Sequence, residues 1–245
     1  MSTTESPDTD LTTVLSADEE CLLGLLDSNN NGYYAHRFNH SSSVCLVAHV
    51  DTKYRKMPLN LKSQEPGWLY SETGVLGADD RAGVYIILKL LSMGLETNVL
   101  FCNGEESGGI GALKAYDELD MSHIKLFIEL DFRGHMEYAV YHPQPQWVHD
   151  IPQSIGFTES TGTFTDIAIF YGTPGFNLSV GYYNQHTAEE RLNLHSMDHT
   201  LSIMPDLANT AEKICREQMG KSLQRPCGSY RGNRGERKLY SPENR

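Results

Sequence analysis

The chain has 245 residues, a formal net charge of −12 and 39% hydrophobic residues, so it is long and apolar enough to bury a full core. Its acidic balance disfavours nucleic-acid binding by the folded domain. No apolar run approaches the roughly 20 residues that cross a bilayer, so we expect no membrane partner. The polar N-terminus resembles neither a signal nor a transit peptide. The five cysteines form no CxxC pair, and we expect a cytoplasmic protein with reduced thiols.

The two ends of the chain differ from its middle. Residues 1–15 lack hydrophobic periodicity, which predicts a flexible leader. Ser16 and Glu19 form a capping box ahead of an apolar stripe, so a short helix should begin there. Residues 221–245 are rich in Arg, Gly, Ser and Pro, which is typical of a flexible basic tail, and a weak anionic partner for it is left open. We therefore predict one folded domain over residues 16–220.

Between these ends, hydrophobic patterns alternate between strand and helix. Apolar runs predict strands at 44–50, 68–70, 97–102, 124–131, 136–142 and 174–181. Apolar spacings of three and four predict helices at 80–94, 108–119 and 197–219, the last kinked or interrupted by Pro205. This order predicts an α/β fold with three layers, α/β/α, around a mostly parallel, mixed central sheet.

Polar side chains follow several of the predicted strands. In open α/β sheets, binding sites form beyond the carboxyl ends of the strands, so these side chains should meet at one edge of the sheet. The candidates are two histidines and six carboxylates: His49, Asp51, Asp79, Asp80, Glu105, Glu106, Asp131 and His186. Imidazoles and carboxylates without cysteine suit a catalytic zinc, cobalt or manganese site. Two ions side by side would need a bridging carboxylate.

The segments AHVDT, LGADDRAG, GEESGG, ELD and NQHTAEE, in that order, resemble the metal-site motifs of the zinc exopeptidase superfamily. Its branches include bacterial aminopeptidases, tripeptidases and aminoacylase-like deacylases. The resemblance covers residues 44–190 and implies the zinc-exopeptidase (phosphorylase/hydrolase-like) fold. It also implies two divalent metal ions, Zn²⁺ or alternatively Co²⁺ or Mn²⁺. One ion would be held by His49 and Asp131, the other by Glu106 and His186, and Asp79 would bridge the two.

Two further roles follow from the same resemblance. Glu105 would be the general base that activates the attacking water, and Asp51 would orient His49 by accepting its second ring N–H. The implied activity is that of a metallo-exopeptidase, an aminopeptidase or di/tripeptidase that cleaves a peptide bond near a free N-terminus. An N-acyl amino acid deacylase or other amidohydrolase with the same metals is an alternative. A catalytically inactive binding module is an alternative of another class.

The chain departs from the superfamily pattern in its size. Asp51 and Asp79 are 28 positions apart, and Asp131 and His186 are 55 apart, so neither gap has room for a lid domain. The substrate-binding and oxyanion groups that a lid supplies are therefore unassigned, and Tyr182 or Tyr183 is the candidate oxyanion donor. The oligomeric state is also open, including whether a partner chain completes the pocket.

Other polar residues have two interpretations. Thr165 and Asp166 form either a pocket-side pair or a helix cap, and Glu190 is either a buried support of the site or an exposed residue. We interpret the remaining histidines of the second half as structural, because no carboxylate cluster adjoins them and the HExxH pattern is absent. They are His135, His142, His149, His195 and His199.

Overall fold

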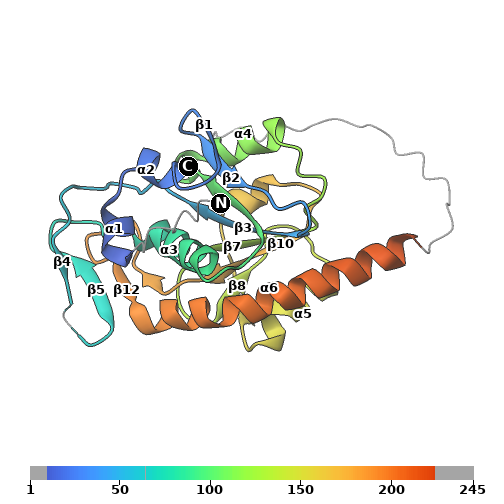
Figure 1. Cartoon of the computed structure of the whole chain (residues 1–245). Coiled ribbons are helices and arrows are strands. Elements are labelled where there is room, and N and C mark those ends of the chain that lie inside the picture. Colours follow the sequence, from blue (N-terminus) through green and yellow to red (C-terminus); the bar gives the residue numbers. More distant parts are fainter. Residues whose placement is uncertain (1–9, 64, 224–245) are drawn as a thin grey trace.

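The computed structural model describes residues 10–63 and 65–223 (Figure 1). Its centre is an eight-stranded sheet in the order β1 (Ser28–Asn30), β2 (Tyr34–Arg37), β6 (Asn98–Cys102), β3 (Val44–His49), β7 (Leu126–Phe132), β10 (Gly175–Ser179), β8 (Glu137–Ala139) and β9 (Thr158–Glu159). The four central strands, from β6 to β10, are parallel. Strands β1, β2 and β8 run antiparallel to their inner neighbours. The predicted mostly parallel, mixed sheet is therefore confirmed.

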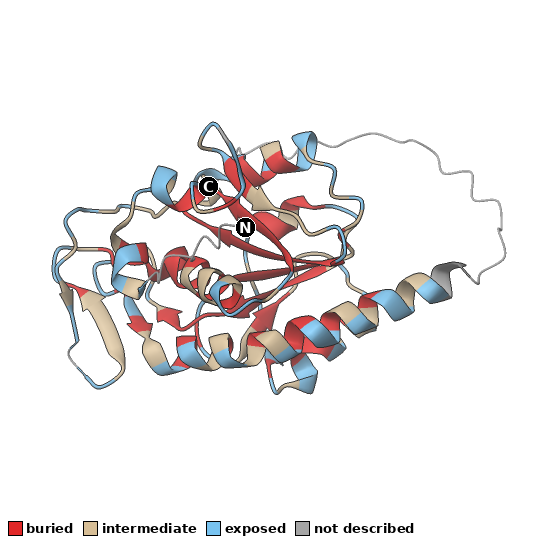
Figure 2. Cartoon of the chain, in the orientation of Figure 1, coloured by how far each residue is buried: buried red, intermediate tan, exposed pale blue. Residues whose placement is uncertain are grey.

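Both faces of the sheet are covered, because its central strands are apolar on both sides. Along β3, Val44, Leu46 and Ala48 belong to one hydrophobic cluster, whereas Cys45 and Val47 belong to the other. The first face carries the helices α3 (Ala78–Ser92), α5 (Gln146–Ser154) and α6 (Leu194–Leu223), and the second carries α4 (Ile110–Glu118) and the 3₁₀ helix η2 (Asp166–Ile169). The sandwich thus has one thick and one thin helical layer (Figure 2).

A second, smaller sheet was not predicted beyond its strand at Trp68. It is antiparallel, in the order β11 (Tyr182–Tyr183), β12 (Arg191–Asn193), β5 (Trp68–Ser71) and β4 (Leu61–Lys62). Leu69 and Leu192 pack against the main core. Strands β4 and β5 come from the short gap between Asp51 and Asp79, β11 comes from the gap between Asp131 and His186, and β12 follows His186.

The prediction of a flexible leader is wrong for residues 11–15. Helix α1 (Leu11–Ser16) begins at Asp10, whose carboxylate accepts the Thr13 N–H at 3.0 Å, and it buries Val14 and Leu15. Ser16 ends this helix, and the next one, α2 (Glu19–Leu23), is capped by Asp18. Two buried apolar side chains anchor the segment, which is too short to show periodicity. Residues 1–9 of the predicted leader lie outside the described residues.

Helix α6 continues through Pro205, so the predicted interruption does not occur. Proline removes one helical N–H, but the buried Met204 and Leu207 on either side of it hold the helix against the core. The predicted tail from residue 224 onward lies outside the described residues. Among the helices of residues 10–63 and 65–223, none offers a stretch apolar and long enough to span a membrane.

Candidate metal centre

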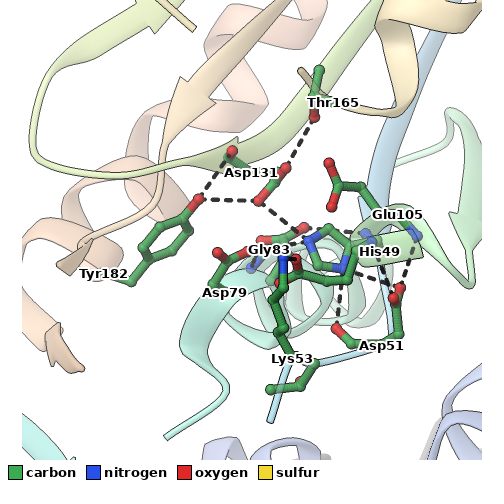
Figure 3. A network of polar contacts seen from close by, with 12 residues as sticks. His49, Asp51, Lys53, Asp79, Gly83, Glu105, Asp131, Thr165 and Tyr182 are labelled. Atoms are coloured by element: carbon green, nitrogen blue, oxygen red, sulfur yellow. Dashed lines mark hydrogen bonds and ion pairs between the residues drawn. The ribbon is translucent and has the colours of Figure 1, made fainter. Parts of the chain in front are cut away.

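The fold brings the five predicted metal ligands, together with Asp51 and Glu105, to one edge of the sheet. Figure 3 labels five of these residues: His49, Asp51, Asp79, Glu105 and Asp131. Strand β3 ends at His49 and its neighbour β7 carries Asp131, while the loop after β6 continues into the 3₁₀ helix η1 (Glu105–Ser107). Asp79 lies in the first turn of α3, and His186 lies in the turn between β11 and β12. The glycines around η1 take up the left-handed conformation that this tight turn needs, with φ of 90° at Gly104.

Asp79 lies between the two histidines. Its Oδ1 is 3.1 Å from His49 Nε2, and its Oδ2 is 3.1 Å from His186 Nε2. Each imidazole faces a second carboxylate as well: His49 Nε2 is 3.6 Å from Asp131 Oδ1, and His186 Nε2 is 2.5 Å from Glu106 Oε1. The five predicted ligands thus form two groups that share Asp79.

Asp80 lies close enough to His49 and Asp131 to join their group, but its oxygens already have partners. Oδ2 accepts the backbone N–H of His49 at 3.2 Å, and Oδ1 accepts that of Gly83 at 3.1 Å. These bonds tie the end of β3 to the start of α3, so Asp80 supports the geometry of the site.

Two buried atoms of the site fit a cation. Among the described residues, Glu106 Oε1 and His186 Nε2 have no hydrogen-bond partner of acceptable geometry, although both are buried. Buried polar atoms without partners are rare and costly. An imidazole nitrogen and carboxylate oxygens directed at one point are the donors that zinc, cobalt and manganese prefer. The residues present therefore fit divalent cations.

The pKa values of the site residues also favour the binding of divalent cations. The neighbouring carboxylates of Asp79 and Glu106 favour the charged imidazole and raise the pKa of His186 to about 10. Burial raises the pKa of Asp131 to about 6 and that of Glu105 to about 9. Carboxylates crowded into a buried site with few positive charges hold protons that divalent cations would displace.

Asp51 connects the two halves of the site. Its carboxylate accepts the backbone N–H groups of Gly104 at 2.8 Å, Glu105 at 3.1 Å and Glu106 at 3.2 Å. It also lies 3.3 Å from His49 Nδ1, which in addition contacts the Asp51 carbonyl oxygen at 3.0 Å. Asp51 therefore positions the glutamate-bearing turn as well as the imidazole, and the first of these contacts was not predicted.

Asp131 is held by two hydroxyl groups. Thr165 Oγ1 donates to Asp131 Oδ2 at 2.9 Å, and the Tyr182 hydroxyl donates to Oδ1 at 3.1 Å. Thr165 makes no side-chain cap of the helix that follows, so the structure favours the pocket-side interpretation of Thr165 over the helix cap. The bond to Asp131 occupies the Tyr182 hydroxyl, which argues against Tyr182 as an oxyanion donor. The Tyr183 ring instead packs against Trp68, with centroids 5.4 Å apart.

Two other residues support the centre. Glu190 is fully buried, and its carboxylate accepts the N–H groups of Gly77 at 2.8 Å and Asp79 at 3.0 Å. This contact confirms the buried alternative for Glu190. Lys53 Nζ lies 3.6 Å from Glu106 Oε2 and supplies a positive charge that the sequence analysis missed. A lysine four residues after His49 has no motif that would have revealed it.

The remaining histidines of the second half belong to neither group of potential ligands among the described residues. The rings of His135 and His199 lie 5.4 Å apart. His142 Nε2 is 2.7 Å from the Ala168 carbonyl oxygen, and His149 Nδ1 is 3.1 Å from the Tyr138 hydroxyl. These contacts agree with the structural interpretation.

A cleft of about 320 Å³ opens onto the centre. Its floor contains Asp79, Glu105, Glu106, Asp131 and His186. The rest of its lining comes from the end of β7 and from loops around the site, and it mixes aromatic, small polar and basic residues: Lys53, Phe132, Arg133, Tyr141, Thr161, Phe164 and Gln185.

No protein-family model and no curated protein matches the sequence. Solved structures do match. A tripeptidase from Staphylococcus aureus is 14% identical with a TM-score of 0.63, and the match covers 84% of this chain and 97% of that one. An aminopeptidase from Desulfurococcus kamchatkensis is 12% identical, with a TM-score of 0.58 and coverage of 82% and 96%. An endoglucanase from Thermotoga maritima is 12% identical, with a TM-score of 0.54 and coverage of 85% and 99%. The chain therefore has the α/β fold that these solved structures share, as predicted.

Proposed function

We propose that the protein is a hydrolase of the zinc exopeptidase superfamily that uses two divalent ions, Zn²⁺ or alternatively Co²⁺ or Mn²⁺. The observation that carries this proposal is the position of Asp79, whose two oxygens face two different imidazoles at 3.1 Å each. A carboxylate placed in this way can bridge two cations, because its charge lies between them. His49 and Asp131 would hold one ion, and Glu106 and His186 the other.

The ions would supply Lewis-acid activation of the scissile carbonyl and a lowered pKa for bound water. Glu105 lines the same cleft without ligating either ion in this assignment, so its carboxylate is free to take a proton from the water and pass it to the leaving amine. Asp51 fixes the tautomer of His49 through Nδ1, so that Nε2 presents its lone pair to the metal. Both histidines must be neutral for this role.

The substrate we propose is a short peptide cleaved next to its free N-terminus. A cleft of about 320 Å³ holds a few residues of a peptide and no more. A tripeptidase and an aminopeptidase are among the similar structures, so we rank a deacylase second. The described cysteines are all unpaired thiols, which supports a cytoplasmic location for this activity.

The endoglucanase among the similar structures suggests a glycosidase as a further candidate. Glycoside hydrolysis needs a pair of carboxyl groups and no metal in most families. The two imidazoles that face Asp79 have no function in that chemistry, which favours the metal-dependent hydrolase. Hydrolysis of cellulose oligosaccharides by the chelator-treated protein would reverse this preference.

The test measures metal content and activity on one sample. We expect about two ions per chain and metal-dependent release of the chromophore from leucine anilide. Glu105→Gln should retain the metals and lose about 10²- to 10⁴-fold in kcat. The exposed Glu96 lies outside the cleft, so Glu96→Gln is the matched control and should keep full activity. Turnover of N-acyl amino acids but not anilides would select the deacylase. A protein that binds no divalent metal after reconstitution would refute the proposal and favour a binding module.

A further inference from the structure

Exposed hydrophobic side chains concentrate on one face of the molecule. Of nine large hydrophobic residues that are exposed in the described part of the chain, six lie around α4, and we name these six the α4 patch: Tyr33, Ile110, Leu113, Tyr116, Phe164 and Tyr171. Leu113 is 48% exposed and Tyr171 is 61% exposed. Figure 2 shows exposed residues along the outer side of α4. Single exposed hydrophobic residues are ordinary, but a group of this size marks an interaction surface.

The sequence of α4 explains why its outer side is apolar. Ile110, Leu113 and Tyr116 recur every three residues and so lie along one side of the helix. Its inner side consists of the small residues Gly111, Ala112 and Ala115, which let it pack closely on the sheet. The large side chains of α4 therefore contribute to the surface instead of the core.

The neighbours of α4 extend the patch. A Cβ added to Gly109 would lie 3.0 Å from Phe164, so this ring covers the residue that precedes the helix. The Tyr116 ring stacks with Phe170 at 6.4 Å, next to Tyr171. On the opposite flank, Lys114 Nζ lies 4.3 Å from the centre of the Tyr33 ring. Tyr33 and Phe164 thus flank α4 on its two sides, and Tyr171 follows the residue that stacks on Tyr116.

The size of the patch suits a protein partner. The exposed parts of the six side chains add up to roughly 600 Å². A stable interface buries about 800 Å² on each partner, and tyrosine is among the residues that dominate its binding energy. The polar side chains that border α4 would supply the remaining area as a rim.

The charges within the patch are self-complementary. Lys114 and Asp117 are three residues apart on α4, where Asp117 is exposed and Lys114 is half-buried. When two copies of α4 pack antiparallel about a two-fold axis, Lys114 of one copy faces Asp117 of the partner subunit, and the pair occurs twice. Two chains of net charge −12 repel each other elsewhere, and at this face the two reciprocal pairs of Lys114 and Asp117 offset part of that repulsion.

We propose that the α4 patch is the homodimer interface of this protein, with α4 packed antiparallel on its counterpart. Phe164 belongs both to the patch and to the wall of the cleft. The second copy therefore stands at the mouth of the cleft and narrows the approach to it. This inference does not depend on the chemistry proposed for the metal centre.

Sedimentation velocity over a wide range of concentration tests the proposal. We expect a monomer–dimer equilibrium in the wild type and a dissociation constant raised about 30-fold or more by Leu113→Asp. Met93 is 65% exposed and lies at the end of α3, off the patch, so Met93→Asp is the matched control and should leave the dimer intact. Circular dichroism establishes that both variants are folded.

A charge exchange tests the orientation of the two helices. Lys114→Asp and Asp117→Lys should each weaken the dimer about tenfold, because each places like charges opposite each other. The double variant should restore the wild-type dissociation constant. A wild type that stays monomeric at every concentration would overturn the proposal, as would a Leu113→Asp variant that behaves like Met93→Asp. A double variant as weak as the single ones would overturn the antiparallel arrangement.

Discussion

Replacing Asp51 by asparagine tests whether one carboxylate organises both halves of the metal centre. The isosteric amide keeps the oxygen that accepts from Gly104 and Glu105, but it places an NH₂ group where Oδ2 accepts the Glu106 N–H at 3.2 Å. A hydrogen bond to a charged group contributes about 1.5–3 kcal/mol, so Asp51→Asn should lower the free energy of unfolding by that amount. Since His49 loses its anionic partner and Glu106 its fixed backbone, zinc affinity should fall about 10- to 100-fold.

Zinc affinity is measured by competition with a chelator of known strength, and stability by denaturant unfolding of the metal-free protein. Asp18→Asn is the control, because Asp18 also accepts a backbone N–H, that of Cys21 at 2.7 Å, but at the cap of α2. It should leave zinc affinity unchanged. A wild-type zinc affinity in Asp51→Asn would refute the reasoning, even if the protein were destabilised.

Three further predictions concern the same site. Gly83→Ala should destabilise the fold by about 3 kcal/mol or more, because the new Cβ would meet the Leu130 carbonyl oxygen at 1.9 Å. The control is Gly220→Ala, whose new Cβ would have no atom within 4 Å. It should be neutral or slightly stabilising in thermal unfolding. Glu190→Gln should weaken zinc binding about tenfold in the competition assay with little change in the far-UV spectrum, because it loosens the backbone before α3. Zinc binding should release protons, since the pKa of His186 is about 10 without metal and the bound imidazole must be neutral. The affinity for zinc should therefore rise with pH up to about 10. Calorimetry in buffers of different ionisation enthalpy counts the protons released on zinc binding. No proton release at pH 7 would contradict the assignment of His186 as a metal ligand.

The central sheet and the position of the site were predictable from sequence, because long apolar strands end in polar residues. His49 and Asp131 lie on neighbouring parallel strands, as expected of the carboxyl edge of an α/β sheet. The second sheet was not predictable, since strands of two residues such as Leu61–Lys62 carry no periodicity. Helix α5 was missed because Pro152 lies inside it and its pattern is brief.

The supporting contacts of the centre were the least predictable part. The Thr165 hydroxyl meets Asp131 across 34 positions of sequence, and Glu190 reaches the backbone of Asp79 across 111. Such contacts depend on how the loops cross in space, and no local pattern encodes them. The α4 patch differs from these contacts. The three-residue spacing of the apolar side chains on α4 is visible in the sequence, but their exposure to solvent is not.

The two halves of the metal centre differ in their access to solvent. His49 is 1% exposed within the end of a core strand, whereas the side chain of His186 is 35% exposed in a surface turn. The ion beside His49 would thus be retained through dilution and purification, and the ion beside His186 would exchange with the surrounding medium. Such a protein would respond to the supply of free metal, since its second position empties first when the metal becomes scarce. Its activity would then report metal availability, while the buried ion would remain bound.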